Sequence, residues 1–203
     1  MRRLGVFGGS FNPVHIGHLI CAEHLRIAAA LDEVIFVPAH VPPHKRPWEL
    51  APPTTRLELV RLAISSNPFF SVSDMELRRK PPSYTIDTIR ELAEREPRSQ
   101  LFFIVGADTI RELPSWREVR QLLSLCTLLV AARPGYAPQE LDDLVPAVGR
   151  EAVEKLRLHY HEIPLIQVSS SDIRDRIKKG LSIRYMVPDP VEDYIRANRL
   201  YLP

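Results

Sequence analysis

Cysteine is scarce in this chain, and charge of one sign never gathers into a run. The 203 residues include two cysteines, Cys21 and Cys126, with no spacing motif around them, so neither a disulfide framework nor a cysteine metal cluster is expected. Lys and Arg number 27 against 25 Asp and Glu, for a net charge of +2. Because the basic residues are scattered among acidic ones, a nucleic-acid partner is not expected.

Long apolar runs are also missing. No stretch approaches the roughly 20 residues of a membrane-spanning helix, and the chain enters an expected strand at once, without the features of a signal peptide. The composition, 45% hydrophobic and 26% charged, is that of an ordinary soluble globular protein. We therefore expect one domain over residues 1–203, located in the cytoplasm and without a membrane partner.

The most informative stretch covers residues 8–18, Gly-Gly-Ser-Phe-Asn-Pro-Val-His-Ile-Gly-His. It lies between an apolar run, residues 4–7, that predicts a buried strand and a helical pattern over residues 19–31. A tight loop between a strand and a helix directs backbone N–H groups and a helix N-terminus toward an anion. Gly8 and Gly9 are expected to permit positive φ and close approach of a ligand.

Two histidines, His15 and His18, stand at the start of that helix. They share one face, about 4.5 Å apart along the axis, and Gly17 leaves space above the first turn. Each imidazole can donate a hydrogen bond near neutral pH, and a cationic one would offset charge on a departing phosphate. Capping or surface histidines are the structural alternative, but the glycine loop and the Phe-x-Pro spacing favour a phosphate site over it.

This stretch resembles the G-x-F-x-P-x-H-x-G-H signature of the nucleotidyltransferase superfamily. The resemblance implies that ATP is bound by Gly8, Gly9, Ser10, Phe11, His15 and His18. The four residues from His15 to His18 are also the signature of class I aminoacyl-tRNA synthetases, so later segments must decide between the two groups.

The rest of the chain alternates strand and helix patterns. A strand, a helix and a second strand over residues 33–37 form a right-handed βαβ unit, which requires a parallel sheet. Further strands are predicted over residues 69–73, 101–105 and 127–132, and helices over residues 54–65, 138–158 and 191–198 and from residues 83 and 173. Candidate helix caps are Thr54 or Thr55 and Ser83. We predict a Rossmann-like α/β fold with helices on both faces of a parallel sheet and a small C-terminal helical part, residues 169–203.

The proline-rich loop over residues 39–47 should lie at the carboxyl edge of the sheet, where ligands of such folds bind. Lys45 within it is either a solvated lysine or a mobile cation within reach of phosphates. Its Pro-Pro-His-Lys segment is similar to one in nicotinate mononucleotide adenylyltransferases, which implies that Lys45 is a phosphate ligand. The Ala39-His40 pair replaces the asparagine of many relatives, so mononucleotide contacts there stay open.

Later segments resemble the same adenylyltransferases. Thr85, in a Ser-Tyr-Thr segment, is implied to lie beside the nicotinate ring. Gly106 and Asp108 follow the most apolar strand pattern and suit a nucleotide ribose, although Asp108 could equally cap the next helix. Trp116 is implied to stack on the pyridine ring, the alternative being a core tryptophan. Arg133, at the end of another strand pattern, is suited to a carboxylate or phosphate.

A second anchor covers residues 168–174, Val-Ser-Ser-Ser-Asp-Ile-Arg. Serines before a helix place hydroxyls and free N–H groups at its positive end, and Arg174 follows one turn in. Serine capping alone would explain the first half. The segment resembles the I-S-S-T-x-x-R motif of the same adenylyltransferases, and not the lysine-rich loop of the synthetases. The resemblance implies that Ser169, Ser170 and Arg174 bind ATP.

The resemblance implies adenylyl transfer, in which the phosphate of nicotinate mononucleotide attacks the α-phosphorus of ATP and pyrophosphate leaves. An ionised phosphate needs no general base, so catalysis depends on alignment and charge neutralisation. The expected catalytic residues are His15, His18, Lys45 and Arg174. The expected mononucleotide-binding residues are Lys45, Thr85, Asp108, Trp116 and Arg133. Mg²⁺, held mainly by the ATP phosphates, is the expected cofactor, and no protein metal site is expected.

Two alternatives stay open. Relatives such as phosphopantetheine adenylyltransferase transfer a nucleotide to another phosphate, but they lack the set formed by Thr85, Asp108 and Trp116. A non-catalytic nucleotide sensor would bind ATP without releasing pyrophosphate. The preference for the acid or the amide of the mononucleotide, and a homo-oligomeric state, are not decided by the sequence.

Overall fold

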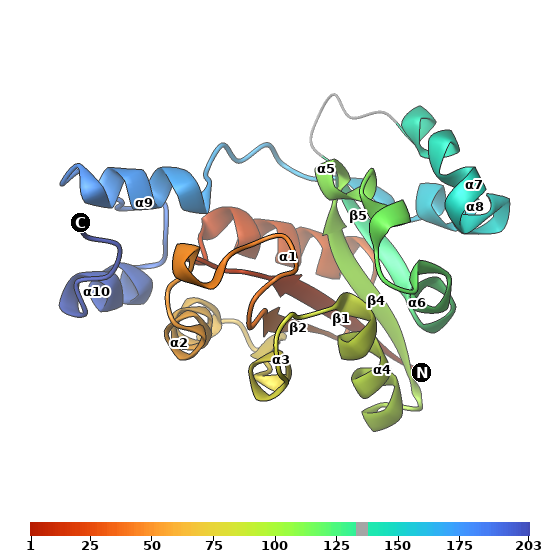
Figure 1. The fold of residues 1–203 in the computed structure, drawn as a ribbon, viewed down its shortest axis with the longest axis horizontal. Coiled ribbons are helices and arrows are strands. Elements are labelled where there is room, and N and C mark those ends of the chain that lie inside the picture. The colour runs from red at the N-terminus through yellow and green to blue at the C-terminus, as the bar shows by residue number, and fades with distance from the viewer. Residues whose placement is uncertain (133–137) are drawn as a thin grey trace. The chain divides into compact units, whose positions relative to one another are not determined.

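The computed structural model describes residues 1–132 and 138–203 (Figure 1). In these residues one six-stranded sheet has the order β3-β2-β1-β4-β5-β6. Its strands are β1 (Arg2–Gly9), β2 (Glu33–Pro38), β3 (Phe70–Val72), β4 (Ser99–Gly106), β5 (Thr127–Ala132) and β6 (Tyr160–Glu162). Strand β4 pairs in parallel with both β1 and β5, and β5 pairs in parallel with β6. The predicted Rossmann-like α/β fold is confirmed, whereas β6 was not foreseen.

Helices connect these strands. The α-helices are α1 (Ile16–Ala28), α2 (Pro53–Ile64), α3 (Met75–Arg78), α4 (Thr85–Arg95), α5 (Ala107–Ile110), α6 (Val119–Leu125), α7 (Val145–Val148), α8 (Arg150–Leu158), α9 (Ser170–Lys178) and α10 (Asp189–Ala197). Short 3₁₀ helices are η1 (Pro47–Glu49), η2 (Leu113–Ser115) and η3 (Pro138–Leu144). The single helix predicted over residues 138–158 is thus wrong. Gly149, at φ +89°, separates α7 from α8 because this conformation lies outside the helical region.

Two predicted helix caps are also wrong. Helix α2 begins at Pro53 after Pro52, without a side-chain cap, because proline already supplies the backbone angle of a first helical turn. Helix α4 begins at Thr85 without a side-chain cap. The Ser83 hydroxyl instead accepts a hydrogen bond from the His40 backbone N–H at 3.0 Å.

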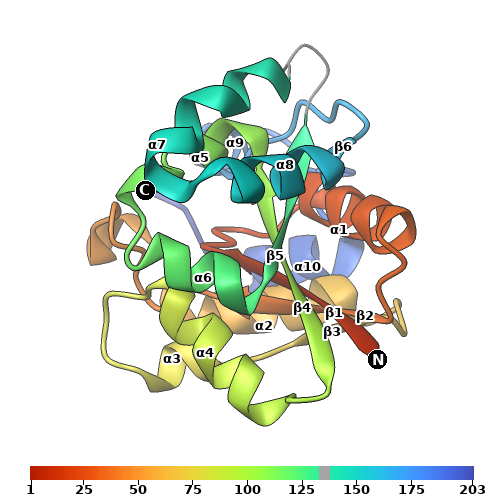
Figure 2. The same ribbon diagram turned by 90° about the vertical axis from the view of Figure 1, so that its right-hand side faces the viewer.

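The described residues cluster into two compact units. The first contains residues 1–7, 21–34 and 84–165. Strand β4 is paired on both edges, with β1 and β5, and its residues 101–105 are all buried. Helices α4 and α6 pack side by side (Figure 2), and α8 packs on β5. This confirms the prediction that the most continuous apolar run is a central strand.

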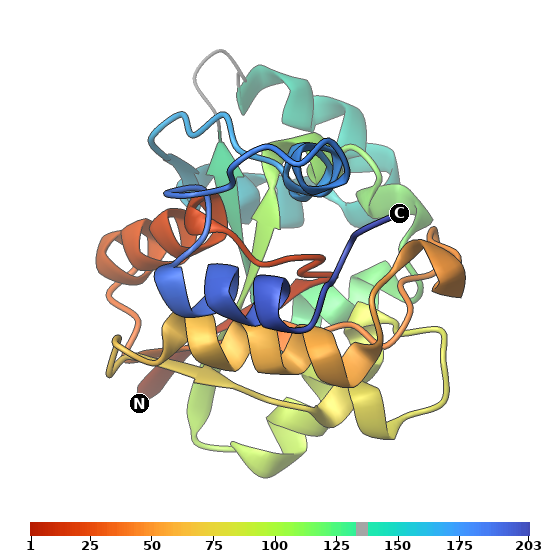
Figure 3. The same cartoon turned by 90° about the vertical axis from the view of Figure 1, so that its left-hand side faces the viewer.

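The second unit contains residues 8–20, 35–83 and 166–203. Helix α2 packs against the C-terminal helix α10 (Figure 3), and both contribute buried aliphatic side chains. This unit therefore combines residues 8–20 and 35–83 with the C-terminal residues 166–203. That the two units form one domain stays a prediction. Within the described parts of the chain, no helix is both long and apolar enough to cross a bilayer.

Candidate active site

The first predicted anchor lies in the second unit, where β1 leads into α1. His15 is 7% exposed, and its ring centroid lies 3.7 Å from that of His18. The His15 backbone N–H donates a hydrogen bond to Nδ1 of His18 at 3.2 Å. Because Nδ1 is the acceptor, the proton of the neutral His18 ring resides on Nε2. This second nitrogen is then a hydrogen-bond donor.

The pKa of His18 lies well below its ordinary value, first because the ring is buried and second because His15 is close. In the absence of ligand, His18 is therefore neutral at physiological pH. Two roles were predicted for this ring, donating a hydrogen bond and carrying a positive charge. The neutral ring of the ligand-free protein fits the first role and not the second.

Glycines in the loop make room for aromatic rings. A Cβ atom on Gly17 would lie 3.1 Å from Nδ1 of His15, and one on Gly9 would lie 3.0 Å from the Phe11 ring. The predicted positive φ at Gly8 and Gly9 is wrong, because both residues belong to the extended strand β1. The positive φ of this loop occurs at Phe11 instead, at 45°.

The second predicted anchor lies in the same unit and contacts the first. Ser169 caps α9, because its hydroxyl accepts a hydrogen bond from the Asp172 N–H at 3.1 Å. The Ser170 hydroxyl donates to the backbone oxygen of Pro13 at 2.8 Å, and Nη1 of Arg174 donates to the backbone oxygen of Asn12 at 2.8 Å. The loop before α1 and the start of α9 therefore form one surface.

Lys45 adds a cation to this surface. Its Nζ donates a hydrogen bond to the Ser10 hydroxyl at 3.1 Å. Burial lowers the pKa of Lys45, and the positive charges of Arg174 and Arg56 lower it further against the opposing effect of Glu49. A group of cations that destabilise one another is stabilised by an anion among them. The site therefore has the electrostatic character of a phosphate site.

The predicted ribose and pyridine residues belong to the first unit. Gly106 ends β4, and a Cβ atom there would collide with Oδ1 of Asp108. Asp108 is exposed in the first turn of α5 and is not its cap. Thr85 is the first residue of α4. Trp116 packs edge-on against Phe103, with ring centroids 6.0 Å apart. Arg133 lies outside the described residues.

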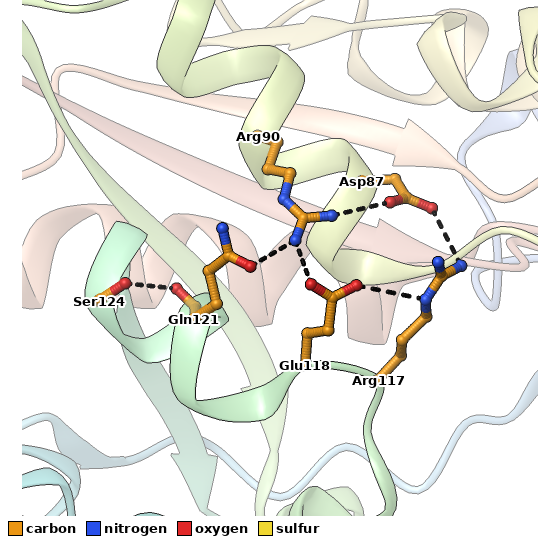
Figure 4. A network of polar contacts seen from close by, with 6 residues as sticks. All are labelled: Asp87, Arg90, Arg117, Glu118, Gln121 and Ser124. Atoms are coloured by element: carbon orange, nitrogen blue, oxygen red, sulfur yellow. Dashed lines mark hydrogen bonds and ion pairs between the residues drawn. The ribbon is translucent and has the colours of Figure 1, made fainter.

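A charged network beside Trp116 was missed by the sequence analysis (Figure 4). Glu118 pairs with both Arg90 and Arg117, while Arg117 also lies 4.0 Å from Asp87 and 4.9 Å from the Tyr84 ring centroid. Arg90 further donates to Gln121. The network ties the turn after Trp116 to the first turns of α4. The chain spacing of Asp87 and Arg90 was the one signal available, and it is common on helix surfaces.

Comparison with known proteins identifies the family. The model of the cytidylyltransferase-like family matches residues 6–176. A probable nicotinate-nucleotide adenylyltransferase of Desulfitobacterium hafniense is 44% identical over 201 residues, which cover 98% of this chain and 96% of the relative. Proteins of the same name are 43% identical in Moorella thermoacetica, where the match covers 99% of this chain and 92% of the relative, and in Thermus thermophilus, where it covers 98% and 99%. The chain belongs to the nicotinate-nucleotide adenylyltransferase family.

A solved structure shares the fold of this chain. It is the Plasmodium falciparum nicotinic acid mononucleotide adenylyltransferase complexed with NaAD, which superposes with a TM-score of 0.77 at 20% sequence identity. The match covers 99% of this chain and 98% of that chain. The resemblance of the chain to nicotinate mononucleotide adenylyltransferases is confirmed by the curated relatives, and the solved structure shows the same fold.

Proposed function

We propose that this protein transfers AMP from ATP to nicotinate mononucleotide, forming deamido-NAD and pyrophosphate. The observation that carries the proposal is the junction of the two anchors, in which Ser170 and Arg174 bind the backbone of residues 12 and 13 within the unit that holds His18. The membership of the chain in the nicotinate-nucleotide adenylyltransferase family supports the choice of substrate.

The proposed chemistry needs positioning more than proton transfer. The phosphate of the mononucleotide is already ionised near neutral pH, so it can attack the α-phosphorus of ATP without a base. The charge that develops on the departing pyrophosphate would be met by the Lys45 ammonium and the Arg174 guanidinium, with His18 donating from Nε2. The free N–H groups at the start of α9 would add donors without a change of charge. His15, stacked on His18, would bind the same phosphates.

Mg²⁺ is the proposed cofactor. No group of three His, Cys, Asp or Glu side chains in the described segments is placed to hold a metal ion. Phosphate oxygens are favoured ligands of Mg²⁺, which often takes few protein ligands at nucleotide sites. The ion would therefore be held chiefly by ATP and would supply positive charge to its phosphates.

The mononucleotide is proposed to contact Thr85, Asp108, Trp116 and Lys45, together with Arg133. Trp116 supplies an aromatic face for the pyridine ring, and the exposed carboxylate of Asp108 can accept from ribose hydroxyls. ATP is proposed to contact Gly8, Gly9, Ser10, Phe11, Gly106, Asp108 and Ser169 in addition to the phosphate-binding residues. Cys21 and Cys126 are buried cysteines that form no disulfide with each other, which suits the cytoplasm proposed as the place of action.

The test measures pyrophosphate release from ATP with nicotinate mononucleotide and, separately, with the amide mononucleotide. We expect release to depend on the acid, with deamido-NAD formed in equal amount. A strong preference for the amide would overturn the substrate but not the chemistry. Binding of ATP without pyrophosphate release from either mononucleotide would contradict the proposed activity and indicate a nucleotide sensor.

A further inference from the structure

Arg56 on α2 is the one charged residue of the described chain that is fully buried, with an exposed fraction of 0%. Its guanidinium donates to three backbone oxygens, Ser10 O at 2.7 Å, His40 O at 2.7 Å and Ala51 O at 2.9 Å. The first oxygen belongs to the loop after β1, and the other two belong to the two ends of the loop between β2 and α2. Only a planar fork with several donors can satisfy three such acceptors at once.

The burial of this charge is costly, since Arg56 forms no ion pair with any residue that the structure describes. Burial accordingly lowers the pKa of Arg56 to about 10, with Tyr201 and Glu76 acting in the opposite direction. A buried cation without a carboxylate partner is a poor way to stabilise a core, because an apolar side chain of similar volume avoids the desolvation cost. A role in geometry accounts for the guanidinium better than a role in stability.

The segments held by Arg56 carry two of the polar groups of the phosphate site. Ser10 follows β1, and its hydroxyl accepts a hydrogen bond from the ammonium of Lys45. Lys45 lies in an exposed loop, so its position depends on how the ends of that loop are fixed. Arg56 holds one end at His40 and the other at Ala51.

Asn12 makes a second tie to the same loop. Its side-chain amide donates to Glu49 O at 3.1 Å and accepts from the Ala51 N–H at 3.0 Å. The backbone oxygen of Asn12 also accepts a hydrogen bond from Arg174. The loop that carries Lys45 and helix α9, which carries Arg174, are therefore both bound to Asn12. The hydrogen bonds of Arg56 are therefore connected to Lys45 through Ser10 and the ends of the loop. They are connected to Arg174 through Ala51 and Asn12.

We propose that Arg56 is a positioning residue that fixes the Lys45 loop against the loop after β1, and so sets the place of the Lys45 ammonium on the ATP phosphates. Arg56 itself does not touch substrate, since it is fully buried and Nε, Nη1 and Nη2 each bind a backbone oxygen. The inference rests on the proposed function for the identity of the ligand, while the hydrogen bonds that carry it are independent of that function.

The test is a double-mutant cycle on the dissociation constant of ATP, measured by titration calorimetry, and on the KM for ATP. Arg56→Lys keeps the charge but cannot span three acceptors, and we expect at least a roughly tenfold weaker ATP affinity. With Lys45→Ala already present, Arg56→Lys should weaken ATP binding by less than about twofold. The side chain that Arg56 positions is then absent, and the effects of substitutions at coupled sites are not additive. The KM for the mononucleotide should change less than the KM for ATP.

Arg61→Lys is the matched control, since Arg61 lies on the same helix with an exposed side chain paired to Glu58. It should leave ATP binding unchanged. Wild-type affinity in Arg56→Lys, or equal losses with and without Lys45, would overturn the proposal and leave Arg56 a structural residue. If Arg56→Lys does not fold, Asn12→Ala replaces it in the cycle with Lys45→Ala, because it removes the hydrogen bond that holds the Ala51 end of the same loop. The same two results would support or overturn the proposal. Absence of pyrophosphate release by the wild type would contradict the proposed function, while the ATP-binding cycle would still decide the role of Arg56.

Discussion

The guanidinium of Arg174 donates a hydrogen bond at 2.8 Å to the backbone oxygen of Asn12, a residue 162 positions earlier in the chain. This bond uses one donor of the fork and leaves the positive charge without a carboxylate among the described residues. The start of α9 and the loop before α1 are thereby held together, so the surface that carries His18 also carries a fixed cation. An anion with several oxygens is the ligand that matches this arrangement.

The partly buried His18 ring should make stability depend on pH. Its folded-state pKa is lowered well below 6.5 by burial and by His15, so below about pH 6.5 the unfolded chain binds more protons than the folded one. This contribution to stability is complete above about pH 6.5 and is lost as the pH falls toward the folded-state pKa. In urea unfolding at several pH values, the free energy of unfolding should fall less on acidification in His18→Asn than in the wild type. An identical pH dependence in both proteins would show that His18 does not carry the effect.

Gly17→Ala should separate activity from stability. In an open helical position alanine is favoured by up to about 1 kcal/mol, but here its Cβ would lie 3.1 Å from the His15 ring, which must move. We expect at least a roughly tenfold loss of turnover with little change in melting temperature.

Gly180→Ala is the matched control for this substitution. Gly180 has φ +67°, and a Cβ atom there would meet no other atom within 4 Å. The change should lower the melting temperature through backbone strain and leave turnover unchanged. Wild-type turnover in Gly17→Ala would show that the His15 ring needs no fixed position.

The positions of strands β1 to β5 and of the two anchors were predictable from sequence because each depends on a local pattern. Residues 101–105 form a continuous apolar run, and the serines before Arg174 precede a helical repeat. The role of Arg56 could not be predicted, because its partners are backbone oxygens of Ser10, His40 and Ala51. Any residue type carries such an oxygen, so no sequence pattern indicates the partner. The cap predicted at Ser83 failed for the same reason, since the donor to its hydroxyl is the backbone of His40.

Glu118→Gln should weaken binding of the mononucleotide and leave binding of ATP unchanged. The carboxylate pairs with Arg90 and Arg117 and so holds the turn that follows Trp116 (Figure 4). We expect the KM for the mononucleotide to rise roughly threefold to tenfold, with the KM for ATP unchanged, because the tryptophan face becomes less well placed. Glu154→Gln, which removes a surface ion pair with Arg157 in the same unit, should change neither value. An equal rise in both KM values would contradict this role.

Tyr201→Phe should not destabilise the free protein. The Tyr201 hydroxyl is buried and has no hydrogen-bond partner in the part of the chain that the structure describes. A buried hydroxyl without a partner costs about 1–3 kcal/mol, so its removal should be neutral or stabilising. Urea unfolding checks this, with the exposed Tyr185→Phe as the control. A loss of more than about 1 kcal/mol would reveal a partner for the hydroxyl.

The most direct test of the phosphate site compares pyrophosphate release by the wild type, His18→Ala, Arg174→Ala and the double variant, with Lys178→Ala on the exposed side of α9 as the control. If both anchors act on one triphosphate, each single change loses at least about 10²-fold in turnover, the double variant loses little more than the worse single one, and the control keeps the wild-type rate. Near-normal rates in both single variants, or losses that multiply in the double variant, would contradict a shared site.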